Sequence, residues 1–134
     1  TNGLYRIVKS ALESGIVKYH GDVDAMREYI HVDDAARASV DAINGEFRNE
    51  NVVLTGQEPM KVIALLTMLA EILNISAESI EFVENKQAGH YVRTPYSYQP
   101  KLGRKYIPPM HVDLGQGLLQ IINEIDFEKQ KRVE

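Results

Sequence analysis

The sequence predicts an α/β protein of about one domain. Apolar residues recur at helical spacing in four segments, at residues 4–14, 36–43, 62–73 and 112–125. Shorter runs typical of strands lie among them, at residues 16–20, 27–32, 51–54 and 79–83. With 134 residues, of which 44% are hydrophobic, the chain is long enough to bury a real core.

Composition and charge exclude several classes of protein. A net charge of −4 gives no electrostatic footprint for nucleic acid or for an anionic membrane, so any anion must be bound locally. The absence of cysteine excludes disulfides and thiolate chemistry and fits a reducing compartment. No apolar run has membrane-spanning length and no signal-peptide pattern is present, so the expected location is the cytoplasm.

The first segment is predicted to be an amphipathic helix that ends at Gly15. Its apolar stripe consists of Leu4, Ile7, Val8, Ala11 and Leu12. Residues 16–20 follow as a short strand and residues 21–24 as a turn. His20, Asp22 and Asp24 carry metal-binding donors around this turn, but no second cluster completes a coordination shell, so we expect no metal site.

The strand at 27–32 is the segment around which the rest of the chain is organised. Arg27, Tyr29 and His31 fall on one face of it. Ile30 and Val32 fall on the other face and are expected to be buried. The strand therefore combines a polar working surface with an apolar backing.

A helix is predicted directly after this strand. Asp33 or Asp34 can cap it, because either side chain can accept from the first free backbone N–H groups. Ala36, Val40 and Ile43 follow at helical spacing and are its expected core face.

Strands and a second helix are predicted to alternate in the following stretch. Residues 51–54 are expected to form a short strand that runs into Thr55 and Gly56. The helix at 62–73 is almost wholly apolar, so it must be covered on more than one side, and Asn74 ends it. Residues 79–83 alternate as a further strand, and the charged residues 126–134 are expected to fray.

Residues 27–36, Arg-Glu-Tyr-Ile-His-Val-Asp-Asp-Ala-Ala, resemble the R-[DE]-[FYW]-[IVL]-[HY]-V-x-D stretch of the NAD-dependent epimerase/dehydratase family. These enzymes are extended short-chain dehydrogenases that act on nucleotide sugars. In the family the arginine of this stretch binds the diphosphate of the nucleotide sugar, so the resemblance assigns that role to Arg27. The planar guanidinium group of arginine can donate two parallel N–H bonds to phosphate oxygens, which agrees with the assignment. Tyr29 shares the face of Arg27 and is included in the expected substrate site.

Further stretches extend the resemblance over essentially the whole chain. Residues 16–24 resemble the family strand that lies against the nucleotide base, which implies that Lys18, Tyr19 and His20 line a base pocket. In residues 84–100 the family has a second arginine that reaches the diphosphate, here Arg93, with Tyr91 on the same face. The family commonly has R-x-[GD]-D at this place, whereas this chain has Arg-Thr-Pro-Tyr. A solvated loop arginine is the alternative for Arg93.

The resemblance implies the carboxyl-terminal part of the family fold, with the last parallel strand or strands of a Rossmann-type sheet and a small α/β substrate-binding subdomain. Residues 51–54 resemble the last parallel strand of the family's sheet, which implies that this strand is central and buried. Residues 101–108 resemble the family's K-x-x-L-G-[WFY]-x-P signature with slightly different spacing, and residues 112–125 resemble its terminal helix. Gly-Gln-Gly at 115–117 is a helix-packing feature and not a dinucleotide fingerprint. Tyr5 and Lys9 have the spacing of the family's catalytic pair, but they lie far too close to the arginine strand and are expected to be helix-surface residues.

Residues 1–134 are accordingly expected to be a substrate-binding portion, with the amino-terminal NAD-binding portion absent. NAD or NADP would serve the parent protein at a site outside this chain, and no catalytic residue is expected within it. The expected function is to bind a nucleotide-diphosphate sugar for an epimerase or dehydratase. A non-catalytic module for a nucleotide diphosphate and a protein-interaction domain are the alternatives. Family members often dimerise through helices that would precede Thr1, so a homodimer is a further alternative.

Overall fold

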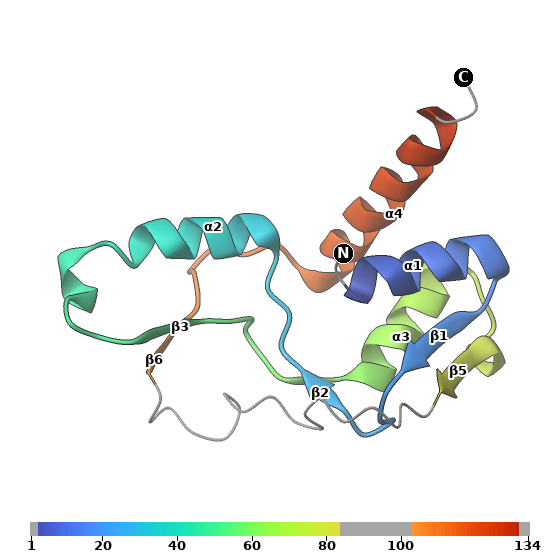
Figure 1. Cartoon of the computed structure of the whole chain (residues 1–134), viewed down its shortest axis with the longest axis horizontal. Helices are drawn as coiled ribbons and strands as arrows, with labels where there is room; N and C mark the ends of the chain where they lie inside the picture. The colour runs from blue at the N-terminus through green and yellow to red at the C-terminus, as the bar shows by residue number, and fades with distance from the viewer. Residues whose placement is uncertain (1–2, 84–102, 132–134) are drawn as a thin grey trace.

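The computed structural model describes residues 3–83 and 103–131 (Figure 1). Helices and strands alternate along it, which confirms the predicted α/β class. In chain order the elements are α1 (Gly3–Ser14), β1 (Val17–His20), β2 (Met26–Arg27), α2 (Val32–Asp41), β3 (Val52–Leu54), β4 (Met60–Lys61), α3 (Val62–Ile72), β5 (Ile80–Val83), β6 (Arg104–Tyr106) and α4 (Leu114–Lys131). Short 3₁₀ turns lie at Gly45–Phe47 and Ala77–Ser79.

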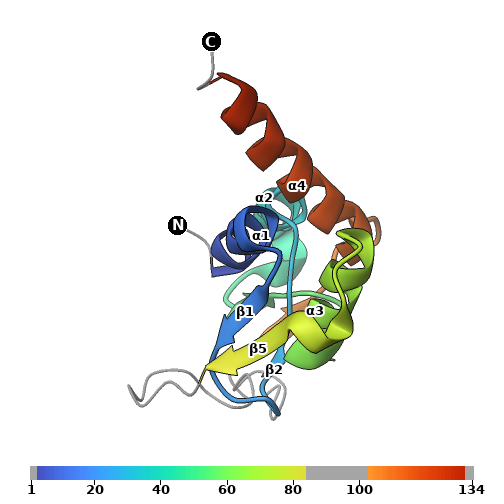
Figure 2. The same ribbon diagram turned by 90° about the vertical axis from the view of Figure 1, so that its right-hand side faces the viewer.

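The described strands form three pairs. β1 and β5 are parallel, with Val17 opposite Ile80, and Figure 2 shows them side by side next to α3. β3 and β6 are also parallel, with Val53 opposite Lys105. β2 and β4 form a short antiparallel pair. The two parallel pairs lie far apart in Figure 1, and the segment from β2 to α2 runs between them.

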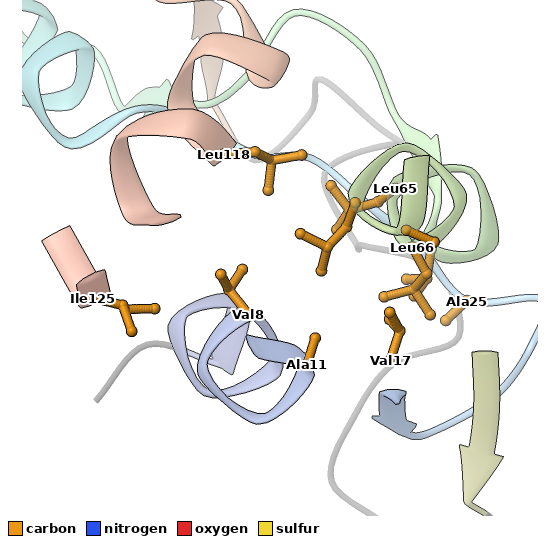
Figure 3. Packing of buried hydrophobic residues seen from close by; sticks show 11 residues of the cluster. Val8, Ala11, Val17, Ala25, Leu65, Leu66, Leu118 and Ile125 are labelled. Atoms are coloured by element: carbon orange, nitrogen blue, oxygen red, sulfur yellow. The ribbon is translucent and has the colours of Figure 1, made fainter. Parts of the chain in front are cut away.

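The hydrophobic core lies where α1, α3, α4 and β1 meet. Figure 3 shows Leu65 and Leu66 of α3 among Val17, Ala25 and Leu118, which come from three other parts of the chain. The completely buried side chains include Val8, Val17, Val62, Leu65, Leu66, Leu69 and Leu118. The apolar helix α3 supplies more buried side chains to the core than any other element described, and it is covered on more than one side, as its sequence predicts.

Two helices end, as the sequence predicts, at a residue with a positive φ angle. Gly15 has φ +70° and donates its N–H to Ala11 O at 2.9 Å, which closes α1. Asn74 has φ +53° and follows α3. Both ends use the left-handed conformation that glycine and asparagine adopt most readily.

Helix α2 differs from its prediction in its cap and in its buried face. His31 is the N-cap, since its Nδ1 accepts from Asp33 N at 3.2 Å, whereas the two aspartates lie in the first turn. The expected core face is wrong, because Val40 and Ile43 are 67% and 83% exposed. Ala36 is exposed as well.

The buried face of α2 contains Asp34 and Ala38 instead. Polar contacts fix this orientation. Asp34 is bonded to the loop before α4, and Asp41 accepts from the hydroxyl of Tyr106 in β6 at 2.9 Å. The helix therefore turns the face that has bonding partners inward, and its more apolar stripe is left outside.

Four further expectations need correction. The strand predicted at 27–32 keeps only its first residue in β2, and Val32 is 73% exposed at the start of α2. Residues 52–54 are half-buried and not central, because β3 pairs only with β6 among the described strands. Helix α4 continues to Lys131, past the point where fraying was expected.

No helix in the described part of the chain is long and apolar enough to cross a membrane.

Candidate functional site

The segment from Arg27 to His31 connects β2 to α2 and forms the centre of the candidate site. Its start is fixed by the pairing of Arg27 with Met60 across β2 and β4. Its middle passes very close to Gly56, where a Cβ atom would lie only 2.0 Å from the carbonyl oxygen of Tyr29. Only glycine permits this approach of two backbones. Its end is fixed by the His31 cap of α2.

Arg27, Tyr29 and Tyr19 lie in one neighbourhood. Burial raises the pKa of Tyr29 to about 12, Tyr19 adds to the rise, and the positive charge of Arg27 opposes it. The Arg27 side chain is half-buried, and its Nη1 donates to the carbonyl of Met26 at 2.7 Å. At neutral pH the Tyr29 hydroxyl is therefore protonated and can act as a hydrogen-bond donor next to a guanidinium.

Strand β1 divides its three predicted base-pocket residues between two faces. Tyr19 lies on the same face as the buried Val17 and packs edge-to-face against Phe82, with ring centroids 5.8 Å apart. Lys18 and His20 fall on the opposite, exposed face. Lys18 pairs there with Glu81 of β5 at 3.6 Å. The structure thus brings Tyr19, but not Lys18 or His20, towards Arg27.

The predicted site residues Tyr91 and Arg93 lie outside the described residues, so their roles stay predictions. The His20, Asp22 and Asp24 cluster is occupied by turn bonding, because Asp22 Oδ1 accepts from the backbone N–H of Asp24 at 2.7 Å. Within residues 3–83 and 103–131, no group of three His, Cys, Asp or Glu side chains is arranged to hold a metal ion.

Glu28 is a buried residue of the site that the sequence reasoning missed. Its side chain is only 3% exposed, and its carboxylate accepts from the hydroxyl of Thr55 and from Lys105 Nζ, the latter at 3.3 Å. A charged residue between Arg27 and Tyr29 was the available signal, since a buried carboxylate needs partners. Those partners come from distant strands and could not be identified from the sequence.

A cavity of about 490 Å³ has Tyr29, but not Arg27 or Tyr19, in its lining. It lies between the starts of α1 and α4, and among the described residues its lining contains four carboxylates and no lysine or arginine. Its other polar groups include His31, whose Nε2 donates to Gln120 Oε1 at 2.7 Å, and His111, whose Nδ1 accepts from Gln57 Nε2 at 3.1 Å. The carboxylates are Asp34, Glu58, Asp113 and Glu124.

Two chemically different regions therefore meet at Tyr29. The Arg27 side carries positive charge and aromatic rings and suits an anion attached to a planar group. The cavity side is acidic and partly apolar and suits an uncharged group that donates hydrogen bonds. Sequence reasoning missed the cavity because its walls come from four separate stretches of the chain, within residues 4–5, 29–34, 55–60 and 107–124.

No protein-family model matches the sequence, and no curated protein matches it. Solved structures do match. A UDP-glucuronic acid 4-epimerase from Bacillus cereus, in complex with NAD, is 27% identical with a TM-score of 0.64, and the match covers 96% of this chain and 39% of that one. A dTDP-glucose 4,6-dehydratase from Bacillus anthracis, also in complex with NAD, is 18% identical with a TM-score of 0.68, covering 96% and 40%.

A GDP-mannoheptose C4 reductase from Campylobacter jejuni, with NADP bound, is 15% identical with a TM-score of 0.50, covering 92% of this chain and 42% of that one. The chain thus spans about 40% of the length of the structures it matches. It has the fold of their carboxyl-terminal portion, which confirms the resemblance and the architecture expected from the sequence. The matched proteins hold NAD or NADP, as the resemblance implies.

Proposed function

We propose that this chain is the nucleotide-sugar-binding portion of an NAD(P)-dependent nucleotide-sugar epimerase or dehydratase. The gathering of Arg27, Tyr29 and Tyr19 at one place carries the proposal. It supplies a guanidinium, a neutral phenol and an aromatic ring, which are the groups needed for a diphosphate and a base. The fold shared with nucleotide-sugar enzymes supports the same assignment.

In this proposal Arg27 binds the diphosphate and Tyr29 donates its hydroxyl to a phosphate oxygen. The high pKa of Tyr29 supports its role, because the phenol stays neutral and does not repel the anion. Tyr19 offers its ring to the base. Lys18 and His20 are assigned only the outer edge of the base site, since β1 turns them to its exposed face.

The cavity beyond Tyr29 is proposed to receive the sugar. Glu58 and Glu124 in its lining would repel a phosphate group but accept hydrogen bonds from sugar hydroxyls, whereas Asp34 is already paired with Arg37. The diphosphate is therefore assigned to the Arg27 side and the hydroxyl-bearing ring to the acidic side. Tyr29, which belongs to both regions, would separate them.

The redox chemistry is assigned to a part of the protein other than these residues. In the described part of the chain no strand leads through a glycine-rich turn into a helix, since β1 leads into the turn at 21–24 and then into β2. The residues present do not fit a dinucleotide, so NAD or NADP is proposed for the parent protein only. Binding energy from the nucleotide would position the sugar for that chemistry.

A second candidate is a binding module with a protein partner. The exposed apolar side chains Val32 and Val40 of α2, and Ile43 just after its end, favour it, because exposed apolar patches mark interaction surfaces. In this candidate the partner would bind the side of α2 opposite to Asp34, and Arg27 would have no role in binding.

Calorimetric titration with UDP, dTDP and GDP, with the corresponding nucleotide sugars, and with NAD would test the proposal. We expect saturable binding of one nucleotide diphosphate, and no NAD binding. Arg27→Ala should weaken that binding by about 1.5–3 kcal/mol, the size of a charged hydrogen bond. Arg48→Ala, which removes an exposed arginine from another loop, is the matched control and should leave the affinity unchanged. Equal affinity for the wild type and Arg27→Ala would contradict the phosphate assignment.

A further inference from the structure

We propose that Glu28 is a positioning residue that holds Arg27 and Tyr29 in the direction required for ligand binding. The inference rests on the proposed function for its ligand, but it makes a separate structural claim. Glu28 would not touch the nucleotide sugar. It would act by anchoring the segment between β2 and α2 to the β3–β6 pair.

Among the described residues, two contacts tie Glu28 to the β3–β6 pair. Thr55 follows the last residue of β3 and donates its hydroxyl to Glu28 Oε2. Lys105 lies within β6 and donates to Glu28 Oε1 at 3.3 Å. Because β3 and β6 are paired in register, both oxygens of the carboxylate are held by one rigid unit.

The burial of Glu28 makes this anchor strong. A carboxylate that is 3% exposed has lost most of its hydration, so breaking its contacts leaves a costly unpaired charge. Lys105 supplies the countercharge and is itself 35% exposed. The segment therefore has one favourable position relative to β3 and β6.

Anchoring Glu28 on one side directs its two neighbours. In extended backbone, adjacent side chains point to opposite sides, and from this alternation we infer that Arg27 and Tyr29 turn away from the β3–β6 pair. The neighbourhood they share with Tyr19 of β1 agrees with this direction. The close approach of Gly56 to Tyr29 O fixes the backbone one residue further on.

Hydrogen exchange and nucleotide titration on Glu28→Gln would test the inference together. The amide keeps the side chain's shape but loses its charge. We expect the amides of residues 27–31 to exchange about tenfold faster or more, while α3 stays unchanged. We expect the affinity for the preferred nucleoside diphosphate to fall about tenfold. Lys105→Gln, at a more exposed position, should give a smaller change in the same direction.

Asp41→Asn is the matched control. It weakens another carboxylate contact to the β3–β6 pair, the bond from Tyr106, without touching the anchored segment. It should lower stability but leave exchange at 27–31 and the affinity unchanged. Unchanged exchange in Glu28→Gln, or equal effects of both substitutions, would overturn the inference. If exchange at 27–31 rises but the wild type binds no nucleotide, the anchoring stands and the proposed function fails.

Discussion

The buried carboxylate of Asp34 accepts the backbone N–H of Val112 at 2.7 Å, across 78 positions of the chain. Its other oxygen accepts from Arg37, one turn further along α2. Burial opposes the charge on Asp34, but these two donors outweigh it and hold the pKa of the carboxyl below its ordinary value of 3.8. One side chain therefore joins α2 to the loop that leads into α4.

Asp34→Ala should lower the free energy of unfolding by about 1–3 kcal/mol at pH 7, because it removes a buried acceptor and leaves the half-buried N–H of Val112 without this bond. A carboxyl whose pKa is lower in the folded state stabilises the protein above the unfolded-state pKa, and the effect is lost as pH falls through the folded-state pKa. The difference between variant and wild type should therefore shrink below about pH 4. Urea unfolding at pH 7 and at pH 3 would measure it. Asp33→Ala, an exposed change in the same turn, should have little effect at either pH.

Tyr29→Phe should make the protein more resistant to alkali. The pKa of Tyr29 is raised from 10.0 to about 12 in the folded state. The neutral phenol therefore stabilises the fold fully below pH 10, and this contribution is lost as pH rises from about 10 to 12. The wild type should lose more stability than Tyr29→Phe over that interval in denaturant titrations. Parallel pH dependence of the two proteins would contradict the assigned environment of Tyr29.

Leu118→Ala should destabilise the protein by about 2–5 kcal/mol, because it opens a cavity in a fully buried part of the core. Leu119→Ala removes the same atoms from the next position of α4, where the side chain is 42% exposed. This neighbouring change should cost much less. Thermal or urea unfolding of the pair would measure the packing of α4 directly, and equal losses would show that α4 does not pack as described.

Gly56→Ala should be strongly destabilising, because the added Cβ would meet the carbonyl of Tyr29 at 2.0 Å. Overpacking against fixed backbone costs about 1–3 kcal/mol or more. The same substitution at Gly45 meets no atom within 4 Å and should be neutral or slightly stabilising. Denaturation midpoints of both variants would provide the comparison, and a neutral Gly56→Ala would refute the close approach.

The helices and strands nearest the core follow directly from local sequence patterns. Helices α1 and α3 combine clear apolar periodicity with a residue that favours the left-handed end, Gly15 or Asn74. Strands β1 and β5 follow from short alternating runs. In these cases the local preference and the tertiary environment agree, so the sequence alone was sufficient to predict the type and place of each element.

The orientation of α2 could not be predicted in the same way. Its stripe of Ala36, Val40 and Ile43 is the more apolar side, and hydrophobicity alone puts that side in the core. The bonds of Asp34 and Asp41 to residues far along the chain decide otherwise. Such partners belong to the fold as a whole and leave no periodic signal in the helix.

The candidate site was predictable only where its residues belong to one local stretch of sequence. Arg27 and Tyr29 could be found because they belong to one short stretch with a recognisable pattern. The separation of Tyr19 from Lys18 follows from strand alternation, so this division of the base-pocket residues is contained in the local sequence. Glu28 and the cavity depend on contacts between distant segments, which the sequence does not display.

The contact between α1 and α4 has a consequence for biosynthesis. Tyr5 of α1 donates its hydroxyl to Glu128 of α4 at 2.9 Å, although 123 positions separate them, and Ile125 is buried in the same core as Val8. A ribosome that adds about 5–20 residues per second needs roughly 6–25 s to bridge that interval. Throughout it, the apolar stripe of α1 lacks part of its native cover. Nascent chains halted before α4 should therefore be bound by chaperones or aggregate, whereas release after α4 allows the core to close.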